Sequence, residues 1–342
     1  MSALATAVSL FERIPLPDGA SRLGIKFLVE RTSRRLAAAE PSAAAKFARA
    51  MARRPIAEHV EAANAQHYEL PPAFFELVLG PQRKYSCCFY QDSIQSLAAA
   101  EEHSLSATAD HADLADGQSI LELGCGWGSL SLWMARRYPA ARILAVSNSQ
   151  SQRQYITARA AAEGLANLAV VTADMNAFAP DRTFDRIVSV EMFEHIANWR
   201  ALLERARGWL AADGRLFIHV FSHCRSPYAF EHRNKADWIA QHFFTGGIMP
   251  SHNLIRQYSD LFTVEAEWRW NGTHYARTLI DWLGNYDRNE AQIDQIMGAV
   301  YGAKARLWKR RWRLFFLASA GLFGFRDGHE WHVSHHRLRA ST

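Results

Sequence analysis

The chain has 342 residues, of which 49% are hydrophobic and 21% are charged, so it can bury a large core. Its formal net charge of +5 is moderate and selects neither an anionic ligand nor a nucleic acid. The cysteines lack the paired CxxC spacing of a zinc site or a disulfide framework, which predicts a cytoplasmic protein: Cys87, Cys88, Cys125 and Cys224. Residues 1–13 do not resemble a signal peptide, and the apolar stretch 314–325 is too short to cross a bilayer.

The N-terminal part of the chain has apolar residues at helical spacing. Ile25, Leu28, Val29 and Leu36 follow this period within a segment rich in Ala, Arg and Glu. We therefore expect a helical region over residues 1–84. We interpret its many arginines as a solvated helix surface.

From residue 85 onwards, short β-type segments alternate with helical patterns. The first five predicted strands are residues 119–123, 142–147, 168–172, 184–191 and 215–222. Residues 262–270 and 331–338 are expected to complete the sheet at one edge. This order predicts an α/β, Rossmann-like domain over residues 85–342, with a seven-stranded, mostly parallel sheet and helices on both faces. Residues 221–262 are too long for an ordinary connection, so we expect an insertion after the fifth strand that covers the substrate.

A glycine-rich turn follows the first predicted strand and precedes a helix over residues 129–137. Gly124, Gly126 and Gly128 would let the backbone approach a ligand at the carboxyl end of that strand. A dinucleotide fingerprint spaces its glycines as GxGxxG to seat a pyrophosphate, whereas Gly128 comes only two residues after Gly126. The spacing therefore favours a cofactor without phosphate.

Polar residues follow the next two strands and suit adenosine. Ser147, Asn148 and Gln152 come after the second strand, and Asp174 and Met175 come after the third. Asp174 can accept a hydrogen bond from the adenine amino group, and the backbone near Met175 can donate to the ring. Together with the glycines, these residues predict a site for S-adenosylmethionine (SAM).

Two carboxylates and an imidazole lie just beyond the fourth strand: Glu191, Glu194 and His195. Methyl transfer requires an oriented nucleophile and a proton acceptor. A protonated amine has no lone pair to offer, so we expect Glu194 or His195 to hold the ammonium and accept its proton. The structural alternative is that Glu191 binds cofactor hydroxyls or backbone and that His195 only packs.

Several motifs resemble the cyclopropane-fatty-acyl-phospholipid synthase superfamily of SAM-dependent transferases, and within it the coclaurine N-methyltransferase branch. They are Tyr85-Ser86-Cys87-Cys88, the turn at 121–128, residues 191–195, residues 243–251 and His274-Tyr275. The resemblance runs from about residue 67 to the C-terminus. It implies SAM contacts from Tyr85, Ser86, Gly124, Gly126, Ser147, Gln152 and Asp174. It also implies substrate and proton handling by Glu191, Glu194 and His195.

For the cyclopropane synthases, the resemblance implies a bound bicarbonate that removes a proton. Its ligands correspond here to Cys87, Glu194, His219 and Tyr275. Two departures favour N-methylation. Phe221 stands where the synthases have a small aliphatic residue, and Glu191 stands where they often have glycine.

Three functions follow from this sequence. The leading one is N-methylation of a small amine whose apolar or aromatic body packs on residues 221–262. The second is cyclopropane formation on unsaturated phospholipid, in which Trp308 and Trp312 of a basic helix would make a transient membrane-surface contact unless they pack in the core. The third is a noncatalytic protein that binds SAM. We expect no nucleic-acid partner and no metal, and a homodimer is left open.

Overall fold

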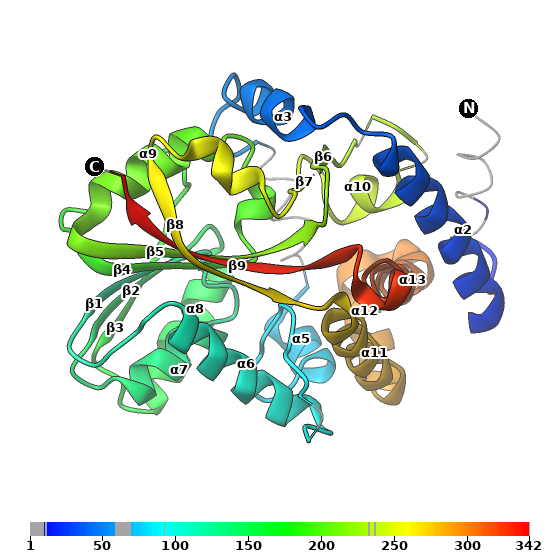
Figure 1. Cartoon of the computed structure of the whole chain (residues 1–342). Helices are drawn as coiled ribbons and strands as arrows, with labels where there is room; N and C mark the ends of the chain where they lie inside the picture. The colour runs from blue at the N-terminus through cyan, green and yellow to red at the C-terminus, as the bar shows by residue number, and fades with distance from the viewer. Residues whose placement is uncertain are drawn as a thin grey trace.

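The computed structural model describes residues 10, 12–58, 70–91, 93–231, 233–235 and 237–341. Its centre is a seven-stranded sheet with the strand order β3-β2-β1-β4-β5-β9-β8 (Figure 1). Five strands are parallel: β1 (Ser119–Leu123), β2 (Arg142–Ser147), β3 (Leu168–Thr172), β4 (Phe184–Val190) and β5 (Leu210–His223). β9 (Trp331–Ala340) pairs antiparallel with both β5 and β8 (Phe262–Trp270). The predicted fold class and all seven predicted strands are confirmed.

Both faces of the sheet are covered, which is why β1 is buried along its whole length. Ile120 packs with α6 (Leu97–His111) and α7 (Ser129–Arg137) on one face. Leu121 and Leu123 point the other way, toward α9 (Trp199–Trp209) and α3 (Ala43–Met51). α8 (Gln150–Ala162) covers β2 and β3 on the α7 face. Figure 1 shows these two helical layers above and below the sheet.

Two N-terminal helices pack against helices from the C-terminal part of the chain. α2 (Asp18–Ala37) packs along α13 (Ala305–Phe323), as Figure 1 shows. Arg313 Nη1 of α13 lies 2.5 Å from Asp18 Oδ1, and Arg311 Nε lies 3.0 Å from Glu12 Oε2. α5 (Pro72–Val78) packs against α11 (Gly272–Arg288). Part of the predicted helical region, residues 59–69, lies outside the described residues.

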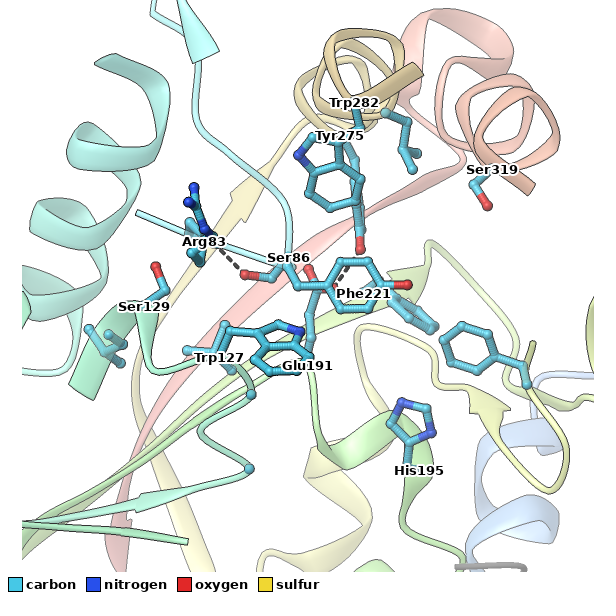
Figure 2. Close-up of a pocket in the computed structure, with 18 of the residues that line it drawn as sticks. Arg83, Ser86, Trp127, Ser129, Glu191, His195, Phe221, Tyr275, Trp282 and Ser319 are labelled. Atoms are coloured by element: carbon cyan, nitrogen blue, oxygen red, sulfur yellow. Dashed lines mark hydrogen bonds between the residues drawn. The ribbon is translucent and has the colours of Figure 1, made fainter. Parts of the chain in front are cut away.

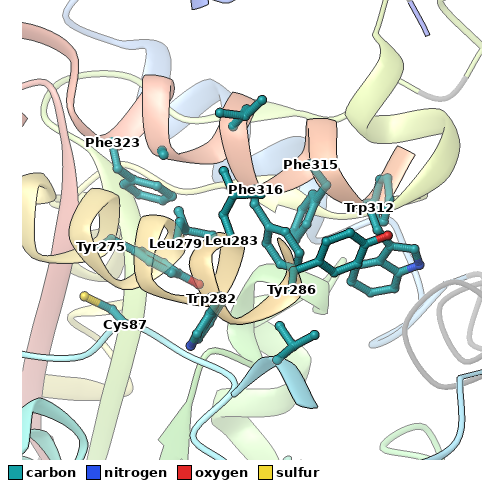
Figure 3. Close-up of a cluster of buried hydrophobic side chains, with 14 of the residues drawn as sticks. Cys87, Tyr275, Leu279, Trp282, Leu283, Tyr286, Trp312, Phe315, Phe316 and Phe323 are labelled. Carbon is teal, nitrogen blue, oxygen red and sulfur yellow. The ribbon is translucent and has the colours of Figure 1, made fainter. Parts of the chain in front are cut away.

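The insertion after β5 holds small elements: β6 (Tyr228–Ala229), α10 (Trp238–His242), β7 (Ile248–Met249) and the 3₁₀ turn η2 (Leu254–Tyr258). A further group of helices lies between β8 and β9 in the sequence. It consists of α11, α12 (Glu290–Tyr301), η3 (Gly302–Lys304), α13 and η4 (Phe325–Gly328). Figure 3 shows α11 and α13 packed through a shared set of aromatic side chains.

The two tryptophans of α13 belong to this core. Trp312 has an exposed fraction of 0%, and Trp308 stacks on Tyr301 with ring centroids 4.7 Å apart. For Trp312, the core-packing alternative therefore holds. In the part of the chain that the structure describes, we find no helix with the length and apolarity to span a membrane.

Candidate active site

Two pockets meet at the carboxyl ends of the central strands, where doubly wound sheets bind their ligands. Gly124, Gly126, Glu191 and His195 line both of them, so the two form one continuous cleft. We call the part that contains Ser147, Asn148, Gln152, Asp174 and Met175 the polar pocket. We call the part that contains Tyr85, Ser86, Tyr275 and a wall of aromatic rings the aromatic pocket (Figure 2).

The glycine turn shapes the floor of the cleft. Gly124 has a φ of +78°, in the left-handed region, and a Cβ placed on it would lie 2.6 Å from Cγ of Met192. A Cβ on Gly128 would lie 2.6 Å from Ile156, so this glycine allows α7 and α8 to approach. A Cβ on Gly126 would meet nothing within 4 Å among the described residues. The backbone at Gly126 is therefore accessible to a ligand.

Polar atoms in the polar pocket are arranged for a ligand with ring nitrogens and hydroxyls. The Ser147 hydroxyl donates to Gln152 Oε1 at 2.7 Å and so fixes that side chain. Gln152 Nε2 is buried and has no hydrogen-bond partner among the described residues. The exposed Asp174 accepts from the backbone N–H of Asn176 at 2.9 Å and keeps further acceptor capacity. A buried donor without a partner and an accessible carboxylate match the needs of adenosine.

Glu191 stands at the junction of the two pockets, one residue after β4. Its Oε1 accepts the N–H of Cys87 at 2.9 Å and is 3.2 Å from His219 Nε2. Its Oε2 accepts the hydroxyl of Tyr275 at 2.5 Å, as Figure 2 shows. Burial raises the pKa of this carboxyl, but the hydrogen bond from His219, the charge of Lys84 and the Cys87 N–H together lower it below its usual value. Glu191 is therefore an ionised carboxylate inside the protein.

Glu194, three residues later, is in a different state. It is fully buried, and it lines neither pocket. Its Oε1 accepts the backbone N–H of Phe221 at 2.8 Å, and its Oε2 has no partner in the described part of the chain. Burial, and then the charge of Glu191, raises the pKa of Glu194 well above its usual value. Glu194 is therefore protonated and neutral at neutral pH.

His195 lines both pockets and stacks on Phe244, with ring centroids 4.9 Å apart and ring planes 13° apart. Burial lowers its pKa to about 4, against the opposing charge of Glu191. It is therefore a neutral imidazole at neutral pH. Such a ring can accept one hydrogen bond and donate another.

The family model for mycolic acid cyclopropane synthetase matches residues 57–331. The (S)-coclaurine N-methyltransferase of Thalictrum flavum subsp. glaucum is 34% identical over 285 residues, which cover 82% of this chain and 79% of that protein. The chain belongs to this family. The cyclopropane-fatty-acyl-phospholipid synthase of Escherichia coli (strain K12) is 29% identical over 78% of this chain and 66% of its own length.

Solved structures agree with this membership. A crystal structure of coclaurine N-methyltransferase bound to N-methylheliamine and S-adenosylhomocysteine superposes with a TM-score of 0.87 at 32% identity, over 94% of this chain and 98% of that chain. A cyclopropane synthase from Mycobacterium tuberculosis superposes with a TM-score of 0.69 at 24% identity, over 83% of this chain and 99% of that chain, and shares the fold. The chain is a SAM-dependent methyltransferase, and the glycine turn, Gln152 and Asp174 fit that cofactor.

The structure divides the predicted catalytic residues into two groups. Glu191, His195 and Tyr275 line the cleft. Cys87, Glu194 and His219 are fully buried behind it. The Cys87 thiol donates to the backbone carbonyl of Cys88 at 3.3 Å, and burial raises its pKa well above the usual value, so it is no nucleophile.

Apart from Tyr275, the residues that α11 and α13 contribute to the pocket wall were not expected from the sequence. They are Leu279 and Trp282 of α11 and Phe315, Ser319, Leu322 and Phe323 of α13. The insertion adds Phe230 and Phe244, as expected. The residues of α13 recur at spacings of four, three and one, which is one helix face. That face could have been noticed because, at helical spacing, the small and polar Ser319 stands between the large Phe315 and Leu322.

The histidines of β9 do not gather into one site. His335 faces His219, whereas His332 and His336 face His252 on the other side of the sheet. Within the described ranges, no group of three or more His, Cys, Asp or Glu side chains is placed to hold a metal ion.

Proposed function

We propose that this enzyme transfers a methyl group from SAM to the nitrogen of a small amine with an apolar or aromatic body. One observation carries the proposal: an ionised carboxylate, Glu191, is held by three donors at the point where the polar pocket opens into the aromatic pocket. Most aliphatic amines are cations at neutral pH, so they need an anionic partner and a proton acceptor before they can attack. Glu191 provides both.

Different side chains of the cleft bind the amine, accept its proton and exclude water. SAM, when bound, supplies an electrophilic methyl group. Glu191 binds the ammonium and takes its proton, and the neutral His195 accepts a hydrogen bond from the same nitrogen. The aromatic rings exclude water and attract a cationic amine through their faces. Because Glu194 is neutral, the site carries one negative charge next to the amine, and a singly charged ammonium balances it.

A bicarbonate-dependent reaction fits these residues less well. The family resemblance assigns bicarbonate to groups that correspond to Cys87, Glu194, His219 and Tyr275. Three of these four residues already direct hydrogen bonds to the carboxylate of Glu191. A bound bicarbonate would have to displace this side chain and bring a second negative charge beside it. The amine is therefore the proposed substrate, and unsaturated phospholipid is the alternative.

We also propose the division of the chain that the sequence predicts, with an N-terminal region over residues 1–84, a catalytic domain over residues 85–342 and, within it, residues 221–262 as the cover of the substrate. We place the enzyme in the cytoplasm because Cys87, Cys88, Cys125 and Cys224 are all free thiols. A transient membrane contact and a homodimer remain predictions.

The test uses SAM with a fully deuterated methyl group, supplied with a panel of benzylic and cyclic amines and, separately, with vesicles of unsaturated phospholipid. An N-methyl product keeps all the methyl deuterium, whereas a cyclopropane loses one deuterium to the base. Labelled amine supports the proposal. Labelled lipid alone overturns it in favour of the synthase alternative. SAM binding by calorimetry with neither product would indicate a noncatalytic binder.

A further inference from the structure

A row of three histidines leads from Glu191 to the surface of the protein. His219 Nε2 lies 3.2 Å from Glu191 Oε1, and His219 Nδ1 lies 2.8 Å from His335 Nε2. His335 Nδ1 lies 2.7 Å from His111 Nδ1. His219 and His335 have exposed fractions of 0%, whereas His111 is partly exposed. Each ring nitrogen along this row is therefore paired with the next, from the cleft outward.

The fold places these rings side by side through three different elements. His219 of β5 and His335 of β9 are direct partners in the antiparallel ladder. His111 ends α6 and stacks on Trp268 of β8, with ring centroids 3.9 Å apart. Trp270 packs within 5.4 Å of His219 and 4.3 Å of His335, between ring centroids. The aromatic packing leaves these imidazoles little freedom to turn.

The hydrogen-bond chemistry fixes the position of every proton in the row. An ionised carboxylate accepts and does not donate, so His219 must carry its proton on Nε2. His219 Nδ1 is then an acceptor, which requires His335 to carry its proton on Nε2. His335 Nδ1 is in turn an acceptor, which requires a proton on His111 Nδ1. One direction of donation runs through all three rings toward Glu191.

We propose that His335 and His111 are positioning residues that hold His219 in the tautomer whose Nε2–H faces Glu191. This inference rests on the proposed function, because it assigns to the row the task of keeping Glu191 ionised for an ammonium substrate. If His335 did not donate, His219 could shift its proton to Nδ1 and turn a lone pair toward the carboxylate. Glu191 would then lose one of its three donors, its pKa would rise, and it would bind the ammonium less well.

The surroundings keep all three rings neutral, as the row requires. Burial lowers the pKa of His219, lowers that of His335 well below its usual value and lowers that of His111 to about 4. Glu191 favours a positive charge on His219 through its hydrogen bond and its charge, but burial and Lys84 outweigh it. Lys84 also opposes a positive charge on His335, and Arg337 opposes one on His111, where Asp110 favours it. A protonated His111 would still donate from Nδ1. Acid at the surface therefore does not reverse the row.

The test compares substitutions of two neighbouring histidines on β9. His335→Leu removes the donor, whereas His335→Gln restores an amide N–H close to the position of Nε2. His336→Leu is the matched control, because His336 lies on the same strand, is 2% exposed and faces His252 on the other side. Melting temperature and SAM affinity by calorimetry show whether each variant is folded.

With an amine that the enzyme methylates as substrate, we expect His335→Leu to lower kcat/KM for the amine about tenfold and to move the acid limb of the pH profile of kcat/KM to higher pH by about one unit. KM for SAM should stay unchanged. His335→Gln should recover most of the loss, and His336→Leu should leave the pH profile in place. The inference fails if His335→Leu and His336→Leu behave alike, or if leucine and glutamine at 335 give the same acid limb.

Nitrogen-15 NMR of labelled histidine tests the row without turnover. We expect Nε2–H on His219 and His335 and Nδ1–H on His111 in the wild type. Any other set of tautomers overturns the inference. If these tautomers are present but no amine is methylated, the proposed function is wrong, while the direction of the hydrogen bonds in the row is confirmed.

Discussion

Replacing Glu191 with glutamine removes the charge on which the proposed reaction depends and changes little else. The amide oxygen can still accept from the Cys87 N–H and from His219 at the position of Oε1, where these contacts are 2.9 and 3.2 Å. At the position of Oε2, the Tyr275 hydroxyl can turn from donor to acceptor for the new N–H₂. The geometry should therefore survive, while the ammonium loses its ion partner and its proton acceptor.

A positioned base typically contributes about 10²–10⁴-fold in rate, so we expect Glu191→Gln to lower kcat/KM for the amine by about 10³-fold. SAM affinity should change by less than about threefold, since the adenosine contacts that we propose lie in the polar pocket and each lost neutral hydrogen bond is worth little. The assay is product formation by mass spectrometry at saturating SAM, with calorimetry for SAM binding.

The control is Glu330→Gln. Glu330 is 7% exposed and pairs with His223 at 3.4 Å, outside both pockets, so it reports the cost of neutralising a buried carboxylate beside a histidine. The reasoning is refuted if Glu191→Gln keeps more than about a tenth of the wild-type kcat/KM, a loss too small for a positioned base. It is also refuted if the loss is matched by an equal loss of SAM binding.

Three further substitutions test the glycine turn, the aromatic pocket and the buried Glu194. Gly124→Ala should weaken SAM binding at least about tenfold by calorimetry, because it combines a positive φ with a clash against Met192, whereas Gly117→Ala, at a φ of +81° with open space, should leave SAM affinity unchanged. Ser319→Leu should raise KM for bulky amines about tenfold and spare small ones in steady-state kinetics, since it fills the aromatic pocket. Glu194→Gln should flatten the pH dependence of the melting temperature. The raised pKa of Glu194 means that the folded state binds the extra proton, so the wild type loses stability as the pH rises from about 4.3, the unfolded value, toward the folded pKa. A variant as pH-sensitive as the wild type would contradict that assignment.

The framework of this protein could be predicted from its sequence because its signals are local. The five parallel strands are short apolar runs bounded by polar turns, and the glycines that end β1 adopt positive φ. The bounds of β1, β2, β3 and β8 agree with the sequence analysis to the residue. Local patterning also predicted that Ser147, Gln152 and Asp174 lie together, as they do in the polar pocket, since the carboxyl ends of parallel strands meet at one edge of the sheet.

The roles within the acidic motif could not be predicted in the same way. Glu191 and Glu194 are three residues apart and chemically alike, yet Glu191 faces the cleft as a carboxylate and Glu194 is buried and neutral. The difference arises from the backbone, because Glu191 has a φ of +48°, and from partners that are distant in sequence: Cys87, His219 and Tyr275. No spacing within residues 191–195 contains that information.

The aromatic wall of α11 and α13 escaped prediction for a related reason. Phe315 and Phe323 have the spacing of ordinary core residues in an amphipathic helix, and most of the residues around them are core residues. One face of each helix reaches the cleft only because α13 packs against α11. Both helices belong to the connection between the antiparallel strands β8 and β9. The histidine row depends equally on the pairing of β5 with β9, which was expected only as an edge of the sheet.

The most direct measurement of the central claim is chemical rescue of Glu191→Gly. Glycine adopts the φ of +48° without strain and leaves the donors of Cys87, His219 and Tyr275 without their carboxylate. Methylation of the amine should nearly vanish in this variant and should rise at least about tenfold when formate or bicarbonate is added at constant pH. If the variant binds SAM and neither anion restores any activity, or if it is active without them, Glu191 is not the proton acceptor and the account is wrong.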